Sequence, residues 1–312
     1  MKRLLYPLIL PALWLSTLQV LQAQDEAIFS HYLVNPILIN PAVAGFEDEY
    51  QLFGHVRAHQ TGFAEFPKTY ALSYNGPIGN TFGLGALIMS DNAAQLNRFR
   101  VQLQYAFRFK LGDKVKLGVG FSTDIQQWRL DNSIMDDSGF DLGDDVLDDY
   151  MNGRWFFDAS VGAYATFGEN AFAGISIVNL VQNRLDNIAV EGGAGGPLQY
   201  FTLFGGYRFL LDDGGIELTP SLLVHQVRNA PFEVDFNVLA GFFDRQFQAG
   251  LSYRTTGTMS LLIGTSISFF DLYYSYDFLF DQFSQYNAGS HEITLAFRFN
   301  PKPKGPKSYN RR

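Results

Sequence analysis

Between Asn97 and Lys110 the chain reads Arg98-Phe99-Arg100-Val101-Gln102-Leu103-Gln104-Tyr105-Ala106-Phe107-Arg108-Phe109. The odd-numbered positions are aromatic or aliphatic, and the even-numbered positions are basic, polar or small. Successive side chains of a strand point to opposite faces, so this stretch predicts a strand with one apolar and one hydrated face. A soluble sandwich also alternates, but its outer face is charged and its strands are usually shorter. The stretch therefore favours a strand in lipid, where strands are stable only in a closed barrel.

The same unit of alternating residues and a turn recurs from Tyr50 to Phe299. At about ten residues per membrane strand, this length predicts a transmembrane antiparallel β-barrel of about 14 strands, in the all-β class. No change in composition divides residues 50–299 into two domains. The expected strands are 50–59, 66–76, 81–91, 95–110, 114–127, 154–166, 171–179, 198–211, 215–228, 232–243, 246–254, 257–268, 270–279 and 290–299.

The connections between these strands predict the orientation of the barrel. An even strand number places both ends of the barrel on one side, which is the periplasm for an outer-membrane barrel. Connections on that side are expected to be short hairpin turns, such as 111–113. The longest connections, 128–153, 180–197 and 280–289, then all fall on the external side.

The N-terminus predicts export. Lys2 and Arg3 precede an apolar stretch at 4–15, and a plausible cleavage site follows Ala23, so residues 1–23 are expected to be a signal peptide. Removing Lys2 and Arg3 changes the formal net charge from −8 to −10, and such a chain is not expected to bind nucleic acid. The chain has no cysteine, which excludes disulfides, thiolate metal sites and a lipidated cysteine.

The remaining segments flank the barrel. Residues 24–49 show no clear period and contain Asn35-Pro36 and Asn40-Pro41, so a loop rather than a helix is expected there. Two placements are open for this segment: a plug inside the lumen, or a docking surface under the periplasmic mouth. The second is preferred. Residues 300–312 are basic and proline-rich, and we expect a disordered periplasmic tail.

Residues 29–45 carry a family resemblance. They fit the pattern F-S-x-Y-x-x-N-P-x-x-I-N-P-A-x-A-G, which resembles the N-terminal signature of the PorP/SprF family. Weaker matches continue at Arg57, 67–69, 83–85 and 291–293, so the resemblance spans the whole mature chain. The signature residues, which we take as candidates for binding or docking, are Phe29, Ser30, Tyr32, Asn35, Pro36, Asn40, Pro41, Ala42 and Gly45.

The resemblance implies an accessory component of type IX secretion and gliding. Members of that family are outer-membrane barrels that help export or anchor surface proteins with a C-terminal sorting domain. The implied partners are outer-membrane lipid, other secretion components and these surface proteins. The implied protein is not an enzyme, and we expect no cofactor. The alternative from another class is an outer-membrane diffusion channel or a transporter of hydrophobic compounds.

The histidines do not predict a metal or catalytic site. His55 and His59 are four residues apart, which on a strand separates them by about 13 Å, too far to share one ion. Ser221 and His225 have the same spacing, which denies the hydrogen bond that a nucleophile and its base require. An outer-membrane hydrolase therefore has no credible catalytic constellation.

Charged residues suggest two further features. Parity places Arg100 and Asp124 in the lumen, opposite each other if 111–113 is a three-residue loop. This pair predicts a filled, charge-compensated interior, with an anion-selective pore as the alternative. An external acidic loop could hold Ca²⁺, but its spacing does not fit an EF-hand, and a solvated loop that selects or repels cationic partners is favoured. Its residues are Asp136, Asp137, Asp141, Asp144, Asp145, Asp148 and Asp149.

Overall fold

The structure, a computed structural model, describes residues 29–62, 66–132, 150–181, 200–212, 215–227, 232–280 and 288–299. The expected signal peptide, the basic tail and the seven aspartates of the acidic loop lie outside these residues. The strands are β1 (Tyr50–Ala58), β2 (Lys68–Ile78), β3 (Phe82–Ala93), β4 (Leu96–Leu111), β5 (Val115–Leu130), β6 (Arg154–Phe167), β7 (Ala171–Ile177), β8 (Tyr200–Tyr207), β9 (Phe209–Asp212), β10 (Ile216–Val227), β11 (Glu233–Phe242), β12 (Phe247–Arg254), β13 (Thr258–Ile267), β14 (Phe270–Leu279) and β15 (Ser290–Phe299).

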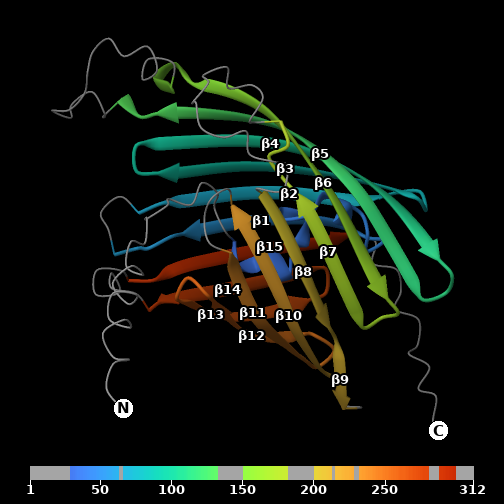
Figure 1. Cartoon of the computed structure of the whole chain (residues 1–312). Helices are drawn as coiled ribbons and strands as arrows, with labels where there is room; N and C mark the ends of the chain where they lie inside the picture. The colour runs from blue at the N-terminus through green and yellow to red at the C-terminus, as the bar shows by residue number, and fades with distance from the viewer. Residues whose placement is uncertain are drawn as a thin grey trace, which may run out of the picture.

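These strands form one closed antiparallel barrel (Figure 1). Neighbours in sequence pair with each other, and β1 pairs with β15 from Tyr50↔Phe299 to Ala58↔His291, which closes the sheet. We call this β1–β15 pairing the seam. β8 and β9 both pair with β10 and together occupy one position in the barrel. The barrel therefore has 14 strands, as the sequence predicts.

The two faces of the barrel differ in chemistry. On β4, Leu103 and Phe107 are 46% and 45% exposed on the outside, whereas Gln104 and Arg108 are 1% and 3% exposed on the inside. Aliphatic and aromatic side chains cover the outer face of the other strands as well. An apolar exterior of this extent is unfavourable in water and suits a hydrocarbon layer. Among the described residues, no helix is long and apolar enough to cross a bilayer.

The two ends of the barrel differ in their connections. Those after β2, β4, β6, β11 and β13 are short, and we call this the short-turn end. The longest connections, between β5 and β6, β7 and β8, and β14 and β15, meet at the opposite end, the long-loop end. This separation agrees with the asymmetry expected from the sequence.

One predicted register is wrong. Leu111 pairs with Val115, so the loop between β4 and β5 is 112–114 and not 111–113. The strand extends through Leu111 because Gly112 is the residue that adopts the left-handed conformation, at φ 67°. As a result Asp124 lies opposite Gln102, one pleat away from Arg100.

Candidate functional site

The N-terminal segment, residues 29–49, consists of three short helical turns. Asn35 and Asn40 each stand before a proline and lie outside the right-handed helical region. Proline restricts the residue before it in this way and is tolerated at the first helical position. The Asn40 side chain also accepts a hydrogen bond of 2.9 Å from the Ala42 amide. The turns are η1 (Ser30–Leu33), η2 (Pro36–Leu38) and η3 (Pro41–Val43).

The N-terminal segment lies inside the barrel (Figure 1). Gln104 on β4 donates to the Ile37 carbonyl at 3.0 Å, and Ser176 on β7 donates to the Ile39 carbonyl at 2.6 Å. Arg108 donates to the Gly45 carbonyl at 2.7 Å. The preferred placement at the periplasmic mouth is therefore wrong for these residues, and the plug interpretation holds.

The segment runs along the lumen. Ser30 contacts residues near the long-loop ends of β1, β14 and β15. Gly45 lies toward the short-turn end, where its amide donates to Asn75 Oδ1 at 3.2 Å. Between these points the Asn40 amide group donates to the carbonyls of Ala163 and Ile175, at 3.0 and 3.1 Å. The segment is thus bonded to the wall on several sides of the barrel.

A buried ionic network holds the start of the segment. Arg57 on β1 contacts Asp277 Oδ2 at 2.6 Å and Glu292 Oε2 at 2.8 Å, and all three side chains are at most 3% exposed. Ser30 joins this network because its amide donates to Glu292 Oε2 at 2.8 Å and its hydroxyl donates to Asp277 Oδ2 at 3.0 Å. Arg57 Nη1 also donates to the Ser30 hydroxyl, at 3.1 Å.

The two residues after Ser30 make further buried polar contacts. His31 Nδ1 lies 2.6 Å from Thr294 Oγ1 and 3.3 Å from Glu292 Oε1. Burial lowers the pKa of His31 more than the nearby Glu292 carboxylate raises it, which favours the neutral imidazole. The Tyr32 hydroxyl accepts a hydrogen bond of 2.7 Å from the Asn237 amide.

Apolar side chains of the segment fill the remaining space in small clusters. Phe29 packs with Ala71, Leu87 and Met89 on β2 and β3. Ile37, which is 1% exposed, packs with Ala44 and Ala106. The largest cluster joins Tyr32, Ala42, Val43 and Phe46 to Tyr164, Phe204 and Leu223 on three strands of the wall. Burying these residues inside the lumen removes the apolar patch that an exposed segment would present.

Glycines in the wall make room for the segment. A Cβ atom on Gly120 of β5 would lie 2.6 Å from the Cα of Ala42, closer than non-bonded carbons can approach. In the segment, Gly45 has a φ of 62°, and a Cβ atom there would lie 2.5 Å from the carbonyl oxygen of Gly76. At these glycines the backbone of the segment therefore packs directly against the backbone of the wall.

Cavities lie beside the segment in the part of the barrel that the structure describes. One is lined by Phe29, Leu38, Leu87 and Met89, with His225 from the opposite wall. Another opens toward the short-turn end and is lined by charged residues of the segment and wall, including Glu47, Glu49, Arg208, Arg245 and Arg298.

The other residues considered in the sequence, Arg100, Asp124 and the histidines, occupy different places in the barrel. Arg100 Nε lies 2.8 Å from Asp124 Oδ1, a diagonal pair rather than a directly opposed one. His225 Nδ1 lies 2.9 Å from the hydroxyl of Thr202, its partner on β8. His59 lies beyond the end of β1, whereas His55 faces the buried network.

Sequence reasoning missed the wall residues that bind Ser30. Arg57 and the 291–293 stretch appear in the family resemblance, but no pattern assigned them a role. Asp277 gave no signal beyond its inward parity on β14. These residues contact Ser30 only because the barrel closes, since Ser30 and Asp277 are 247 positions apart.

These features define an outer-membrane β-barrel with a segment of its own chain folded into the lumen. The chain belongs to the type IX secretion system membrane protein PorP/SprF family, whose model matches residues 21–297. It is a protein of the outer membrane. No curated protein matches the chain significantly.

Solved structures of other barrels resemble this one in architecture. The outer membrane protein Omp33 of Acinetobacter baumannii is 10% identical with a TM-score of 0.48, covering 82% of this chain and 100% of that one. The CymD monoaromatic hydrocarbon channel is 12% identical with a TM-score of 0.49, covering 87% and 92%. The toluene transporter TbuX of Ralstonia pickettii is 9% identical with a TM-score of 0.47, covering 84% and 92%.

Proposed function

We propose that this barrel is a non-enzymatic accessory component of type IX secretion and gliding that helps export or anchor particular surface proteins. Its partners are then other secretion components and surface proteins with a C-terminal sorting domain. The observation that carries the proposal is the position of residues 29–45. The stretch that resembles the family signature is the stretch that occupies the lumen.

A filled lumen favours a docking role over a conducting one. A permeation path would require the segment to leave, which breaks the hydrogen bonds of Ser30 to the Arg57 network and those of the segment to Gln104 and Arg108. A hydrogen bond to a charged group contributes about 1.5–3 kcal/mol. Surfaces at the two ends of the barrel are then left to contact proteins. At the long-loop end, the acidic loop that includes Asp136 and Asp149 would select or repel cationic partners.

A transporter of hydrophobic compounds is the second candidate. The cavity lined by Phe29, Leu38, Leu87 and Met89 is apolar on one side, as sites for small organic molecules commonly are. This candidate predicts that such compounds bind there and cross the barrel when the segment moves.

Gene deletion in the source organism separates the two candidates. Under the docking proposal, the deletion strain loses particular adhesins from the cell surface, as measured by surface proteomics, while uptake of small solutes is unchanged. Reduced uptake of hydrophobic compounds with normal surface adhesins would reject docking in favour of transport. The wild-type gene supplied on a plasmid is the control, and it must restore whichever property was lost.

Conductance in planar bilayers tests the filled lumen directly. We expect the purified barrel to show no sizeable steady conductance, and a variant lacking residues 29–45 to conduct. Large anion-biased steps from the unaltered protein would contradict a plugged interior and support the pore interpretation of the lumen charges.

A further inference from the structure

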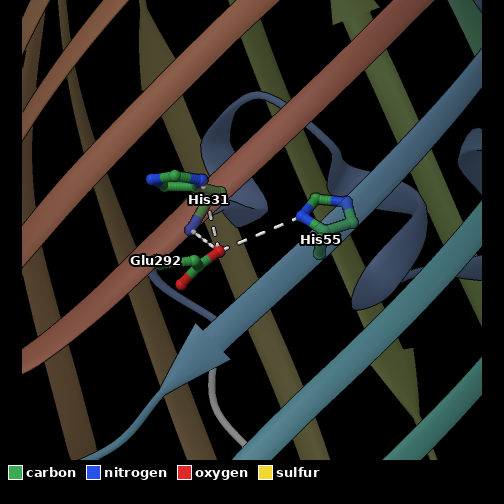
Figure 2. A group of neighbouring side chains, drawn as sticks. All are labelled: His31, His55 and Glu292. Atoms are coloured by element: carbon green, nitrogen blue, oxygen red, sulfur yellow. Dashed lines mark hydrogen bonds and ion pairs between the residues drawn. The ribbon is translucent and has the colours of Figure 1, made fainter.

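Three side chains with metal-binding atoms converge under the seam (Figure 2). His31 comes from η1, His55 from β1 and Glu292 from β15, and one donor atom of each lies within 4.8 Å of the other two. Glu292 Oε1 is 3.3 Å from His31 Nδ1 and 4.0 Å from His55 Nδ1. The side chains of all three residues are fully buried.

We propose that His31, His55 and Glu292 bind a divalent transition-metal ion, Zn²⁺ in the first place, which fastens the N-terminal segment to the seam. Two imidazole nitrogens and one carboxylate oxygen are a common zinc donor set, whereas Ca²⁺ and Mg²⁺ prefer oxygen donors throughout. Zinc bonds of about 2.0–2.2 Å place tetrahedral donors roughly 3.3 Å apart. The His31–Glu292 pair already has that separation. The His55 ring has to move inward, by about 0.7 Å toward Glu292 and by up to about 1.5 Å toward His31.

Charge at the site favours a cation. The neighbouring network contains one guanidinium, Arg57, and two carboxylates, Asp277 and Glu292, all buried. One guanidinium against two carboxylates leaves this network with one negative charge, which is unfavourable away from water. The nearby Arg254 does not supply the balance, because it is already shared between two other buried carboxylates. A divalent ion at the three donors offsets the negative charge.

The surrounding polar groups suit a metal-bound His55, whereas His31 Nε2 is buried without a hydrogen-bond partner. A histidine that binds through Nδ1 usually donates its Nε2–H to an oxygen. The Asn35 side chain lies 2.8 Å from His55 Nε2, and its carbonyl oxygen can take that position when the amide rotates. The Thr294 hydroxyl lies 2.6 Å from Nδ1 of both rings, closer than the roughly 3.3 Å between tetrahedral donors, so it has to move when an ion binds.

The site also joins the two ends of the barrel sheet to the segment inside it. His55 and Glu292 belong to the first and last strands, and His31 belongs to the segment inside them. An ion shared by all three stabilises the seam and the plug together, since metal-binding free energy adds to folding free energy when the unfolded chain lacks the site. This inference does not depend on the proposed role in secretion.

Zinc titration of the purified, full-length protein in detergent tests the proposal. After chelator treatment and exchange into metal-free buffer, isothermal titration calorimetry with Zn²⁺ should give one site per chain. His55→Gln and Glu292→Gln should each weaken binding by about tenfold or more. His225→Gln removes a lumen histidine outside the cluster and should bind like the unaltered protein. Absence of zinc binding, or equal binding by H55Q and H225Q, would overturn the proposal.

X-ray absorption on the zinc-loaded, unaltered protein keeps the test decisive if a variant does not fold. The expected shell contains two imidazole nitrogens and oxygen at about 2.0–2.2 Å. A shell made only of oxygen would place the ion elsewhere on the protein and refute the site.

Discussion

Replacing Arg57 by methionine should detach the N-terminal segment while the barrel stays closed. Methionine keeps much of the side-chain volume but removes the guanidinium that contacts Asp277 at 2.6 Å, Glu292 at 2.8 Å and the Ser30 hydroxyl at 3.1 Å. Leaving buried carboxylates without their partner costs about 3–5 kcal/mol. Undocking relieves this penalty because it admits water to the two carboxylates.

This penalty sets the expected increase in the undocked population. Each 1.4 kcal/mol changes an equilibrium about tenfold, so the undocked population should rise by at least about a hundredfold. Hydrogen exchange measured by mass spectrometry reports this opening locally. Peptides from residues 29–45 should exchange about a hundredfold faster in Arg57→Met, while peptides from β4 and β5 keep their protection. Arg129→Met, which removes an exposed arginine on β5, is the control. Unchanged protection of 29–45 in R57M would refute the reasoning.

Two further changes probe the position and fit of the segment. The Ser30 and Ser260 hydroxyl oxygens are 3.5 Å apart, so cysteines at both positions should form a disulfide under mild oxidation, detected by a gel shift. The control pair, Ser30→Cys with Ser221→Cys, should not crosslink. Equal crosslinking of both pairs would contradict the docked position of the segment. Gly120→Ala should loosen the segment by about 1–3 kcal/mol through the clash with its backbone, again measured by hydrogen exchange. Gly54→Ala, where a Cβ atom meets nothing within 4 Å, should leave exchange of the segment unchanged, and equal effects of the two substitutions would reject the close fit.

The barrel could be predicted from the sequence because its signal is local. Residues 98–109 alternate strictly, and the structure places Leu103 and Phe107 outside and Gln104 inside. Strand limits agree within a few residues because turn residues such as Gly112 mark the ends of the runs. Even the register error between β4 and β5 is local, since it arose from assigning Leu111 to the loop instead of the strand.

The arrangement inside the barrel could not be predicted in the same way. Whether residues 29–49 plug the lumen or lie under it depends on contacts such as His31 with Glu292, which are 261 positions apart. In the sequence, the nearest histidine to His55 is His59, and a single strand holds these two too far apart to share an ion. The donors that reach His55 come from the segment and from the last strand, and no spacing within one strand reveals them.

The seam and the binding site for the segment share residues, so the order of folding steps can be inferred. Arg57 and Glu292 are directly paired across the seam, so the group that accepts Ser30 exists only after β1 and β15 have paired. Closure should therefore precede docking of the segment. A variant lacking residues 29–45 keeps the seam hydrogen bonds and the Arg57 contacts, and it should still migrate as a folded, heat-modifiable barrel on a gel. If that variant failed to close, the segment would be a template for the seam, and its docking would precede closure.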